Sequence, residues 1–298
     1  IYVSIKGTAY DGGMGVTTSW DCHEPCFKWD WDVKSVGGNS GIGIRGSDQD
    51  VKIDVQNIGS SAARVRTFNN VGTQKNIKLR ITGTGVGSDS VELSSALNVL
   101  ENVEIDLDMT NTTFSALNVA GNATYAVNDV RGSLRCNGAT TRALGMAYAT
   151  NVNLDLSTVT NVSEKIATLN NCDQVSLQLG AAISSTNIGI DGDTCTKISI
   201  NGRDINCNNH CFEFTNSDFI KINVDNIKST ITQPAEFTDC DEISMKGNKI
   251  ESLAGYCIFT TRVNTVKADF NHFSSLGGAG DDCWRAVDTI GGRVTGAK

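Results

Sequence analysis

The chain has 298 residues, of which 39% are hydrophobic, 19% are charged and only 2 are proline. Its formal net charge of −8 at pH 7 argues against nucleic acid or an anionic membrane surface as the main partner. No apolar stretch approaches the length of a transmembrane span and no secretion signal is recognisable, so the sequence predicts no membrane insertion.

The first part of the chain, residues 1–46, begins with a strand-like segment and contains three of the four tryptophans. Trp29 and Trp31 alternate with charged residues, so we expect them in the core of a wide rung. Trp20, Asp21 and His23 lie in a less regular stretch. An indole face can stack on a sugar ring, and a histidine beside a carboxylate can transfer protons. These three residues are therefore one candidate for glycan contact.

From residue 51 onward, short segments in which apolar and polar residues alternate recur at intervals of 22 to 27 residues. The segments begin at Val51, Ile77, Val103, Val130, Val152, Val175, Ile198, Ile220, Ile243 and Val266. Alternation with period two is typical of β-strands, and residues that favour turns fill the intervals between the segments. A fixed repeat of this length indicates a solenoid.

The repeat predicts an all-β fold, namely a right-handed, single-stranded parallel β-helix of about 11 to 13 rungs with 22 to 27 residues each. The hand follows from the preference of parallel strands for right-handed crossovers. We expect one domain over residues 1–298, with irregular first rungs in 1–46 and regular rungs in 47–298. No convincing polar end cap is visible, which suggests a segment of a larger polypeptide.

Charged residues concentrate on the outward face of the third repeated segment and its neighbours. Glu104 and Asp106 are two residues apart, or roughly 6.6 Å along a strand, which approaches the separation of about 6.5–9.5 Å in inverting glycosidases. With Asp155 they are the candidate catalytic carboxylates. Arg80 and Arg131 could bind an acidic sugar. The alternative is a solvated face whose opposite charges neutralise each other across rungs.

Three of the ten cysteines, Cys172, Cys195 and Cys240, occupy the same place in the repeat, three residues before a segment begins. Ser217 takes this place in the repeat between the last two. Equivalent residues on successive rungs lie about 4.8 Å apart, and a free cysteine packs as a small hydrophobic residue. We therefore expect a buried, stacked and reduced column.

Two C-x3-C motifs with an internal histidine stand apart from this column; they run from Cys22 to Cys26, around His23, and from Cys207 to Cys211, around His210. A structural zinc site needs about four ligands, and each motif offers at most three. The sequence therefore predicts no metal and no cofactor, and it leaves a local disulfide or unpaired thiols open. His210 has no convergent partner in the sequence and is expected at the surface.

The repeat and three local motifs resemble a known family. The motifs are Ser19 to His23, Phe27 to Val33 and Gly41 to Gly46. Together with rungs rich in Asn, Ser, Thr and Gly, they resemble the pectate-lyase-like family, and within it bacteriophage tailspikes and tail fibres. The resemblance covers the whole chain at the level of the repeat. It implies an extracellular virion protein of the phage tail, with a host surface polysaccharide and other tail proteins as partners.

A homotrimer is also expected. Tailspike resemblance is one reason, and the other is a set of small outward residues that would allow close approach of neighbouring copies. These residues are Ser133, Ser176, Ser199 and Ser244. Closed symmetric oligomers are the usual assemblies of soluble proteins.

The chain departs from the pectate lyases and polygalacturonases themselves, because their Asn-Thr-Asp, Asp-Asp and Gly-His-Gly series is missing. Their catalytic residues therefore cannot be carried over. Three functions remain open, namely a tailspike-type protein that recognises and in some cases depolymerises a host polysaccharide, a secreted bacterial polysaccharide lyase or hydrolase, and a non-enzymatic virion or adhesin rod. Enzymatic activity is undecided; if present, it is that of a glycoside hydrolase or polysaccharide lyase.

Overall fold

A computed structural model describes residues 2–10, 28–36, 42–44, 47–56, 63–66, 73–276 and 283–297. The structure is an all-parallel β-solenoid of about 9 turns with 73% strand, and the described residues contain no helix. The predicted fold class is confirmed. The sheet of long strands contains 13 strands and the sheet of short strands contains 11.

Contacts between Cα atoms divide the chain into two compact units, Ile1–Leu154 and Asp155–Lys298. In a solenoid each turn contacts only its immediate neighbours, so contacts are dense locally and fall off along the chain. The expectation of a single domain stays a prediction. The strand β12 (Ala149–Val162) contains the boundary between the units.

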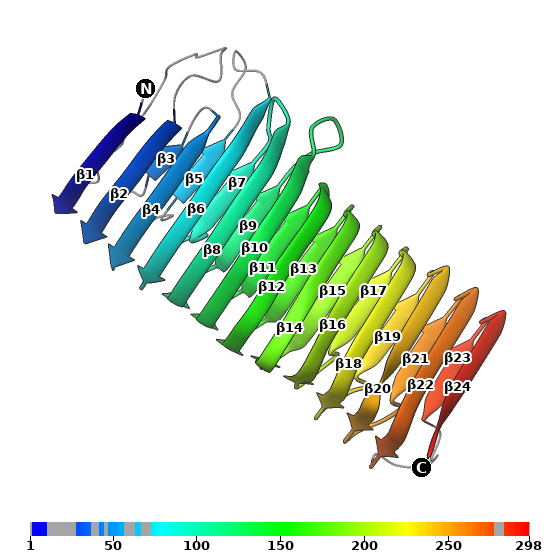
Figure 1. Ribbon diagram of the computed structural model, residues 1–298. Helices are drawn as coiled ribbons and strands as arrows, with labels where there is room; N and C mark the ends of the chain where they lie inside the picture. Colours follow the sequence, from blue (N-terminus) through cyan, green and yellow to red (C-terminus); the bar gives the residue numbers. More distant parts are fainter. Residues whose placement is uncertain are drawn as a thin grey trace. The chain divides into compact units, whose positions relative to one another are not determined.

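In the first unit, the chain alternates between a sheet of long strands and a sheet of short strands (Figure 1). The long strands, in spatial order, are β1 (Tyr2–Tyr10), β2 (Lys28–Val36), β4 (Gln49–Gln56), β6 (Gln74–Thr84), β8 (Leu100–Thr112) and β10 (Val127–Ala139). The short strands are β3 (Ile42–Ile44), β5 (Ala63–Arg66), β7 (Val91–Ser94), β9 (Ser115–Ala120) and β11 (Arg142–Ala147).

The second unit repeats this arrangement (Figure 1). Its long strands are β14 (Asp173–Ser185), β16 (Thr196–Cys207), β18 (Asp218–Ser229), β20 (Glu242–Ser252), β22 (Thr265–Ser275) and β24 (Gly291–Ala297). Its short strands are β13 (Lys165–Asn170), β15 (Ile188–Asp193), β17 (Phe212–Thr215), β19 (Ala235–Thr238), β21 (Ile258–Thr261) and β23 (Trp284–Val287).

Each of the ten repeated segments lies in a long strand, from β4 to β22. Alternate side chains point inward and stack on the equivalent residue of the next turn. In β8, Val103, Ile105 and Leu107 are almost completely buried, and each lies opposite an apolar residue of β6. Burying such a side chain contributes roughly 1.5–3 kcal/mol, which is why the alternation is a reliable sign of these strands.

The short strands were not predicted from the sequence. They form the opposite wall of the core, where Leu117 and Val119 of β9 are buried. In the second unit, Phe214 of β17 and Phe237 of β19 stack with ring centroids 6.3 Å apart. Four residues with two inward side chains give too short a pattern to distinguish such strands from turns.

The register of the outward columns is confirmed from β6 to β10, but it differs between β4 and β6. The sequence repeat placed Lys52 beside Lys78 and Asp54 beside Arg80. Instead, Lys52 lies opposite Arg80, and Asp50 lies opposite Lys78. A shift of two residues leaves the same side chains facing the core, so the apolar pattern is satisfied by both registers.

The column of small residues is confirmed in the second unit. Cys172, Cys195, Ser217 and Cys240 are all buried, and the three cysteines are thiols. The Ser217 hydroxyl accepts a hydrogen bond of 3.0 Å from the backbone N–H of Cys195 on the preceding turn. Burial raises the pKa of the Cys240 thiol to about 11, so it stays protonated at neutral pH.

Candidate functional site

The predicted carboxylates Glu104 and Asp106 lie on the outward face of β8, with 42% and 55% of their side chains exposed. Lys78 of β6 donates a hydrogen bond of 2.5 Å to Oε1 of Glu104. Arg131 of β10 lies with a guanidinium nitrogen 4.0 Å from Oε2 of the same carboxylate. Glu104 is therefore held between cations on both neighbouring turns.

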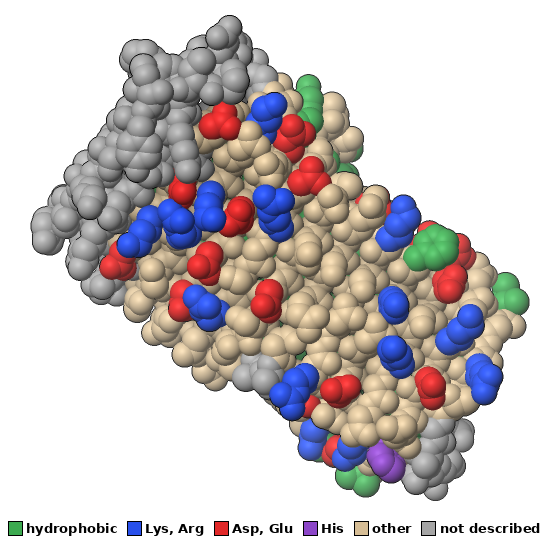
Figure 2. Space-filling model, viewed as in Figure 1, with side chains coloured by type: hydrophobic (Ala, Val, Ile, Leu, Met, Phe, Trp, Pro, Cys, Tyr) green, Lys and Arg blue, Asp and Glu red, His purple; other side chains and the backbone are tan. Residues whose placement is uncertain are grey.

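Asp106 has its own partners on β10. Ser133 donates a hydrogen bond of 2.7 Å to Oδ1, and a guanidinium nitrogen of Arg135 lies 3.7 Å from the same oxygen. Within the described part of the chain, the predicted ligand Arg80 forms no ion pair with Glu104 or Asp106. It donates instead to Asp50 of β4 at 2.6 Å, as the shifted register allows. Figure 2 shows positive and negative side chains interspersed over this part of the first unit.

We call this set the charged face; it consists of Asp50, Lys78, Arg80, Glu104, Asp106, Asp108, Arg131, Ser133 and Arg135. The hydrogen bond from Lys78 lowers the pKa of Glu104, and the charges of Lys78, Arg131 and Arg80 add to the effect. A carboxyl group with a lowered pKa remains ionised at neutral pH. It could serve as a base or pair with a cation, but it is poorly suited to donating a proton.

The structure does not place the other predicted site residues in the charged face. Asp155, the third candidate carboxylate, is exposed on β12 in the second unit. Trp20, Asp21 and His23 lie outside the described residues, as do Cys22 and Cys26 of the first C-x3-C motif. The alternatives stated for them stay predictions.

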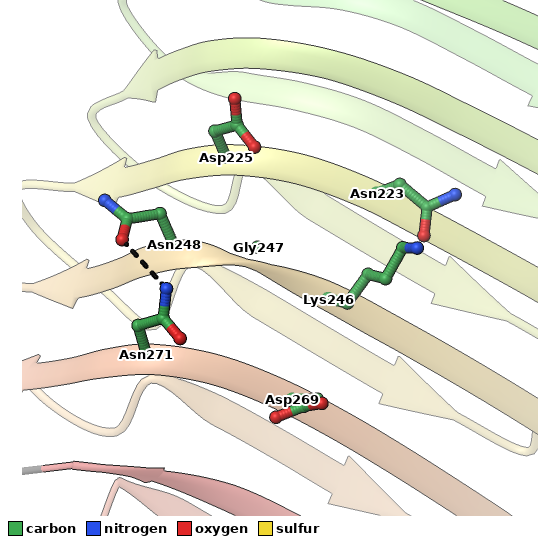
Figure 3. Close-up of a pocket in the computed structure, with 7 residues that line it drawn as sticks. All are labelled: Asn223, Asp225, Lys246, Gly247, Asn248, Asp269 and Asn271. Atoms are coloured by element: carbon green, nitrogen blue, oxygen red, sulfur yellow. Dashed lines mark hydrogen bonds between the residues drawn. The ribbon is translucent and has the colours of Figure 1, made fainter.

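A surface pocket of about 340 Å³ opens on the outward face of β18, β20 and β22 in the second unit (Figure 3). We call it the β20 pocket; it is lined by Asn223, Asp225, Lys246, Gly247, Asn248, Asp269 and Asn271. Its volume is at the lower end of the range of about 300–1,000 Å³ for small-molecule sites. Such sites are usually apolar, whereas amides, carboxylates and one ammonium group line this pocket.

The pocket forms because three equivalent positions on neighbouring turns carry polar side chains around a glycine. Asn223, Lys246 and Asp269 are in register, and Gly247 follows directly after Lys246. A Cβ atom on Gly247 would lie 2.0 Å from the carbonyl oxygen of Val224, so no larger residue fits without a backbone shift. Gly247 lies between the outward side chains of Lys246 and Asn248 and lines the pocket with its backbone (Figure 3).

The amides of the pocket form a ladder along the solenoid. Asn271 donates to Asn248 at 3.2 Å (Figure 3). Asn248 in turn donates to Asn226 of β18 at 3.4 Å. These lengths exceed the usual 2.9–3.0 Å or so, which indicates weak hydrogen bonds. Each amide also has an oxygen acceptor and two N–H donors, so it can exchange a weak partner for a ligand hydroxyl.

The sequence repeat had placed Asn223, Lys246 and Asp269 in one exposed column without assigning them a role. The pocket also needs Asp225, Asn248 and Asn271, which the repeat did not align with them. The one sequence signal for a pocket here is Gly247, which lies between the polar residues Lys246 and Asn248. Glycine inside a strand often marks a place where another backbone or a ligand approaches closely.

His210 is not the isolated surface residue that the sequence suggested. Its side chain is only 17% exposed, and Nδ1 lies 3.5 Å from an oxygen of both Glu213 and Glu236. The register of β17 and β19 sets these two glutamates side by side, which the linear sequence does not reveal. Contact with His210 lowers the pKa of Glu213, and Lys165 contributes.

The second C-x3-C motif holds neither a disulfide nor a metal cluster. Cys207 and Cys211 are buried thiols. Among the residues that the structure describes, no group of three or more His, Cys, Asp or Glu side chains could hold a metal ion. The same part of the chain contains no helix that is long and apolar enough to cross a membrane.

Comparison with known proteins found no relative of this chain. The chain matches no protein-family model, no curated protein and no solved structure. The class that the fold itself defines is the parallel β-solenoid.

Proposed function

We propose that this protein recognises a host cell-surface polysaccharide, in the manner of bacteriophage tailspikes and tail fibres. The observation that carries the proposal is the β20 pocket, a polar hollow on the regular outward face of a parallel β-solenoid. Sugar hydroxyls both donate and accept hydrogen bonds, and the amides and charged groups of the pocket offer both functions.

A solenoid suits a polymeric ligand because it presents equivalent side chains at every turn, about 4.8 Å apart. The amide ladder from Asn226 through Asn248 to Asn271 continues along this axis. Successive sugars could therefore contact successive turns. Two carboxylates and one ammonium group favour neutral or amino sugars over uronic acids at this pocket.

The location and assembly of the protein follow as parts of the same proposal. A tail protein is extracellular in the virion, forms a homotrimer and contacts other tail proteins. Binding is proposed ahead of cleavage, because the pKa of Glu104 is lowered by Lys78 and this carboxyl is already paired with cations.

Binding of the 298-residue chain to immobilised surface polysaccharides of candidate bacterial hosts tests the proposal. In the Lys246→Ala and Asn271→Ala variants, affinity should fall by about 3- to 10-fold for each lost hydrogen bond, which corresponds to roughly 0.5–1.5 kcal/mol. Lys267→Ala removes an exposed lysine from β22 outside the pocket and should bind as the parent does.

Gly247→Ala is a poor test, since the added Cβ would disturb the backbone as well as the pocket. Equal affinity of the parent, Lys246→Ala and Asn271→Ala for a polysaccharide that the parent binds would remove the β20 pocket as the site. Absence of binding to every polysaccharide of a host that whole virions adsorb to would remove the proposed function.

A further inference from the structure

Thiols contact each other at three places in the second unit, and one of the three pairs differs from the others. The pairs are Cys172 with Cys195, Cys207 with Cys211, and Cys257 with Cys283. Both members are buried in the first two pairs. In the third pair Cys257 is buried, whereas Cys283 is only half-buried.

The backbone places Cys257 and Cys283 on adjacent turns, directly before β21 and β23 (Figure 1). Ile258 lies opposite Trp284, and the N–H groups of Cys257 and Ile258 both donate to the carbonyl oxygen of Cys283 at 3.0 Å. Neighbouring positions of this kind are about 4.8 Å apart between Cα atoms, within the range of about 4.4–6.8 Å in disulfides.

Both cysteines lie at a corner and not inside a strand, so neither side chain is held in the pleat of the ladder. Within strands, equivalent side chains on adjacent turns run parallel, which suits a disulfide poorly. A corner residue can rotate its thiol toward its neighbour. The corner also explains how Cys283 reaches solvent while Cys257 points inward, with Sγ 3.4 Å from the carbonyl oxygen of Ser274.

We propose that Cys257 and Cys283 form a modification site, a dithiol that a small-molecule disulfide oxidises to a disulfide joining two adjacent turns. The proposal does not depend on polysaccharide binding. Of the three thiol pairs, only Cys257 and Cys283 are expected to be oxidised, a difference that the sequence does not reveal.

The reaction needs two exchange steps. The thiolate of Cys283 attacks one sulfur of the small disulfide, which forms a mixed disulfide and releases one thiolate. Cys257 then loses its proton to solvent, and its sulfur attacks the sulfur of Cys283 and releases the second thiolate. The protein loses two protons and two electrons, which together equal two hydrogen atoms, and the small disulfide is reduced to two thiols.

The environment of Cys257 makes the second step the slower one. Burial raises the pKa of this thiol to about 12, so its thiolate is scarce at neutral pH and more abundant as the pH rises. Cross-linking should therefore be faster at pH 9 than at pH 7. The two fully buried pairs lack an accessible first thiol and should remain reduced.

Incubation of the native 298-residue chain with oxidised glutathione, followed by mass spectrometry of peptides, tests the site. Among the eight cysteines that the structure describes, we expect the loss of two hydrogen atoms and one cross-linked peptide pair, containing Cys257 and Cys283. In Cys257→Ala, Cys283 should retain a glutathione adduct, and in Cys283→Ser the other thiols of the described part of the chain should stay unmodified. Amide exchange in β21 and β23 should slow in the oxidised parent.

Three results would overturn the proposal, namely thiols that remain unmodified after prolonged incubation, a stable glutathione adduct on Cys283 of the parent, or a cross-link within either buried pair instead. Oxidation of the urea-unfolded chain is the matched control. There several cysteine pairings should form, since only the folded structure selects Cys257 and Cys283.

Discussion

At the scale of single residues, the corners of the solenoid depend on left-handed backbone conformations. A residue with positive φ precedes the buried run of the long strand in turn after turn, for example Asn76 (φ 60°) and Asn102 (φ 54°). Asparagine tolerates this conformation because its short polar side chain bonds locally. The Asn102 amide also donates to Asn76 at 2.5 Å, so these corners are linked along the first unit.

Phe219 occupies the equivalent corner before the buried run of β18, with φ 54° and 53% of its surface exposed. A large residue without a local hydrogen bond is strained there, by roughly 1–2 kcal/mol. Phe219→Asn should therefore raise the free energy of unfolding by about 1 kcal/mol in urea denaturation. Lys221→Asn, in the same strand without positive φ, should show no such gain. A loss of stability in Phe219→Asn would mean that ring contacts outweigh the strain.

The candidate catalytic carboxylates also belong to this scale. If Glu104 and Asp106 act as acid and base, Glu104→Gln and Asp106→Asn should each abolish cleavage of a polysaccharide that the parent depolymerises. Both side chains are substantially exposed, so either change should alter stability by no more than about 0.5 kcal/mol. Thermal unfolding of each variant separates lost chemistry from lost fold.

Asp155→Asn and His23→Ala extend the same assay to the remaining candidates. Cleavage at the parental rate by all four variants would leave the charged face as a set of ion pairs across turns. A parent that binds but never cleaves would leave attachment as the function.

At the scale of elements, the short strands β15, β17 and β19 set three carboxylates in adjacent positions. Asp191, Glu213 and Glu236 are in register, and Lys165 pairs with Asp191 at 2.9 Å. Like charges in register are unfavourable unless cations intervene. The His210 ring lies next to Glu213 and Glu236, with Nδ1 3.5 Å from an oxygen of each.

This cluster predicts a pH dependence of stability. Contact with His210 lowers the pKa of Glu213 below its ordinary 4.5. Its stabilising contribution is therefore present above pH 4.5 and is lost as the pH falls through the lower folded value. His210→Gln should reduce the change in unfolding free energy between pH 5 and pH 3, measured by urea denaturation. Lys165, Asp191 and Glu236 remain in both proteins. An unchanged pH profile would show that His210 does not act on Glu213.

At the scale of the whole molecule, the expected homotrimer rests on outward columns of small residues. In the second unit Ser176, Ser199, Lys221 and Ser244 are in register, so one lysine interrupts the small residues. Sedimentation equilibrium should give three times the chain mass of 31.7 kDa. Ser199→Arg should shift the protein toward monomer without unfolding it, whereas Arg285→Ala, on the sheet of short strands, should leave it trimeric. A stable monomer of the parent chain at all concentrations would contradict the trimer.

Much of the architecture could be read from the sequence because it is local and repeated. The long strands, the buried column of Cys172, Cys195, Ser217 and Cys240, and the outward positions of Glu104 and Asp106 all follow from a period of two inside a longer repeat. Each turn buries its apolar residues on those of the next turn, so one pattern imposes the same constraint many times.

Tertiary structure decided what depends on pairing between turns. The short strands are too brief for a pattern, and a shift of two residues between β4 and β6 keeps every side chain on its face, so apolar alternation cannot select the register. The β20 pocket, the contact of His210 with Glu236 and the proximity of Cys257 to Cys283 likewise join residues about one turn apart. Their chemistry arises only when the turns are stacked, because the distances across turns are absent from the linear order of the chain.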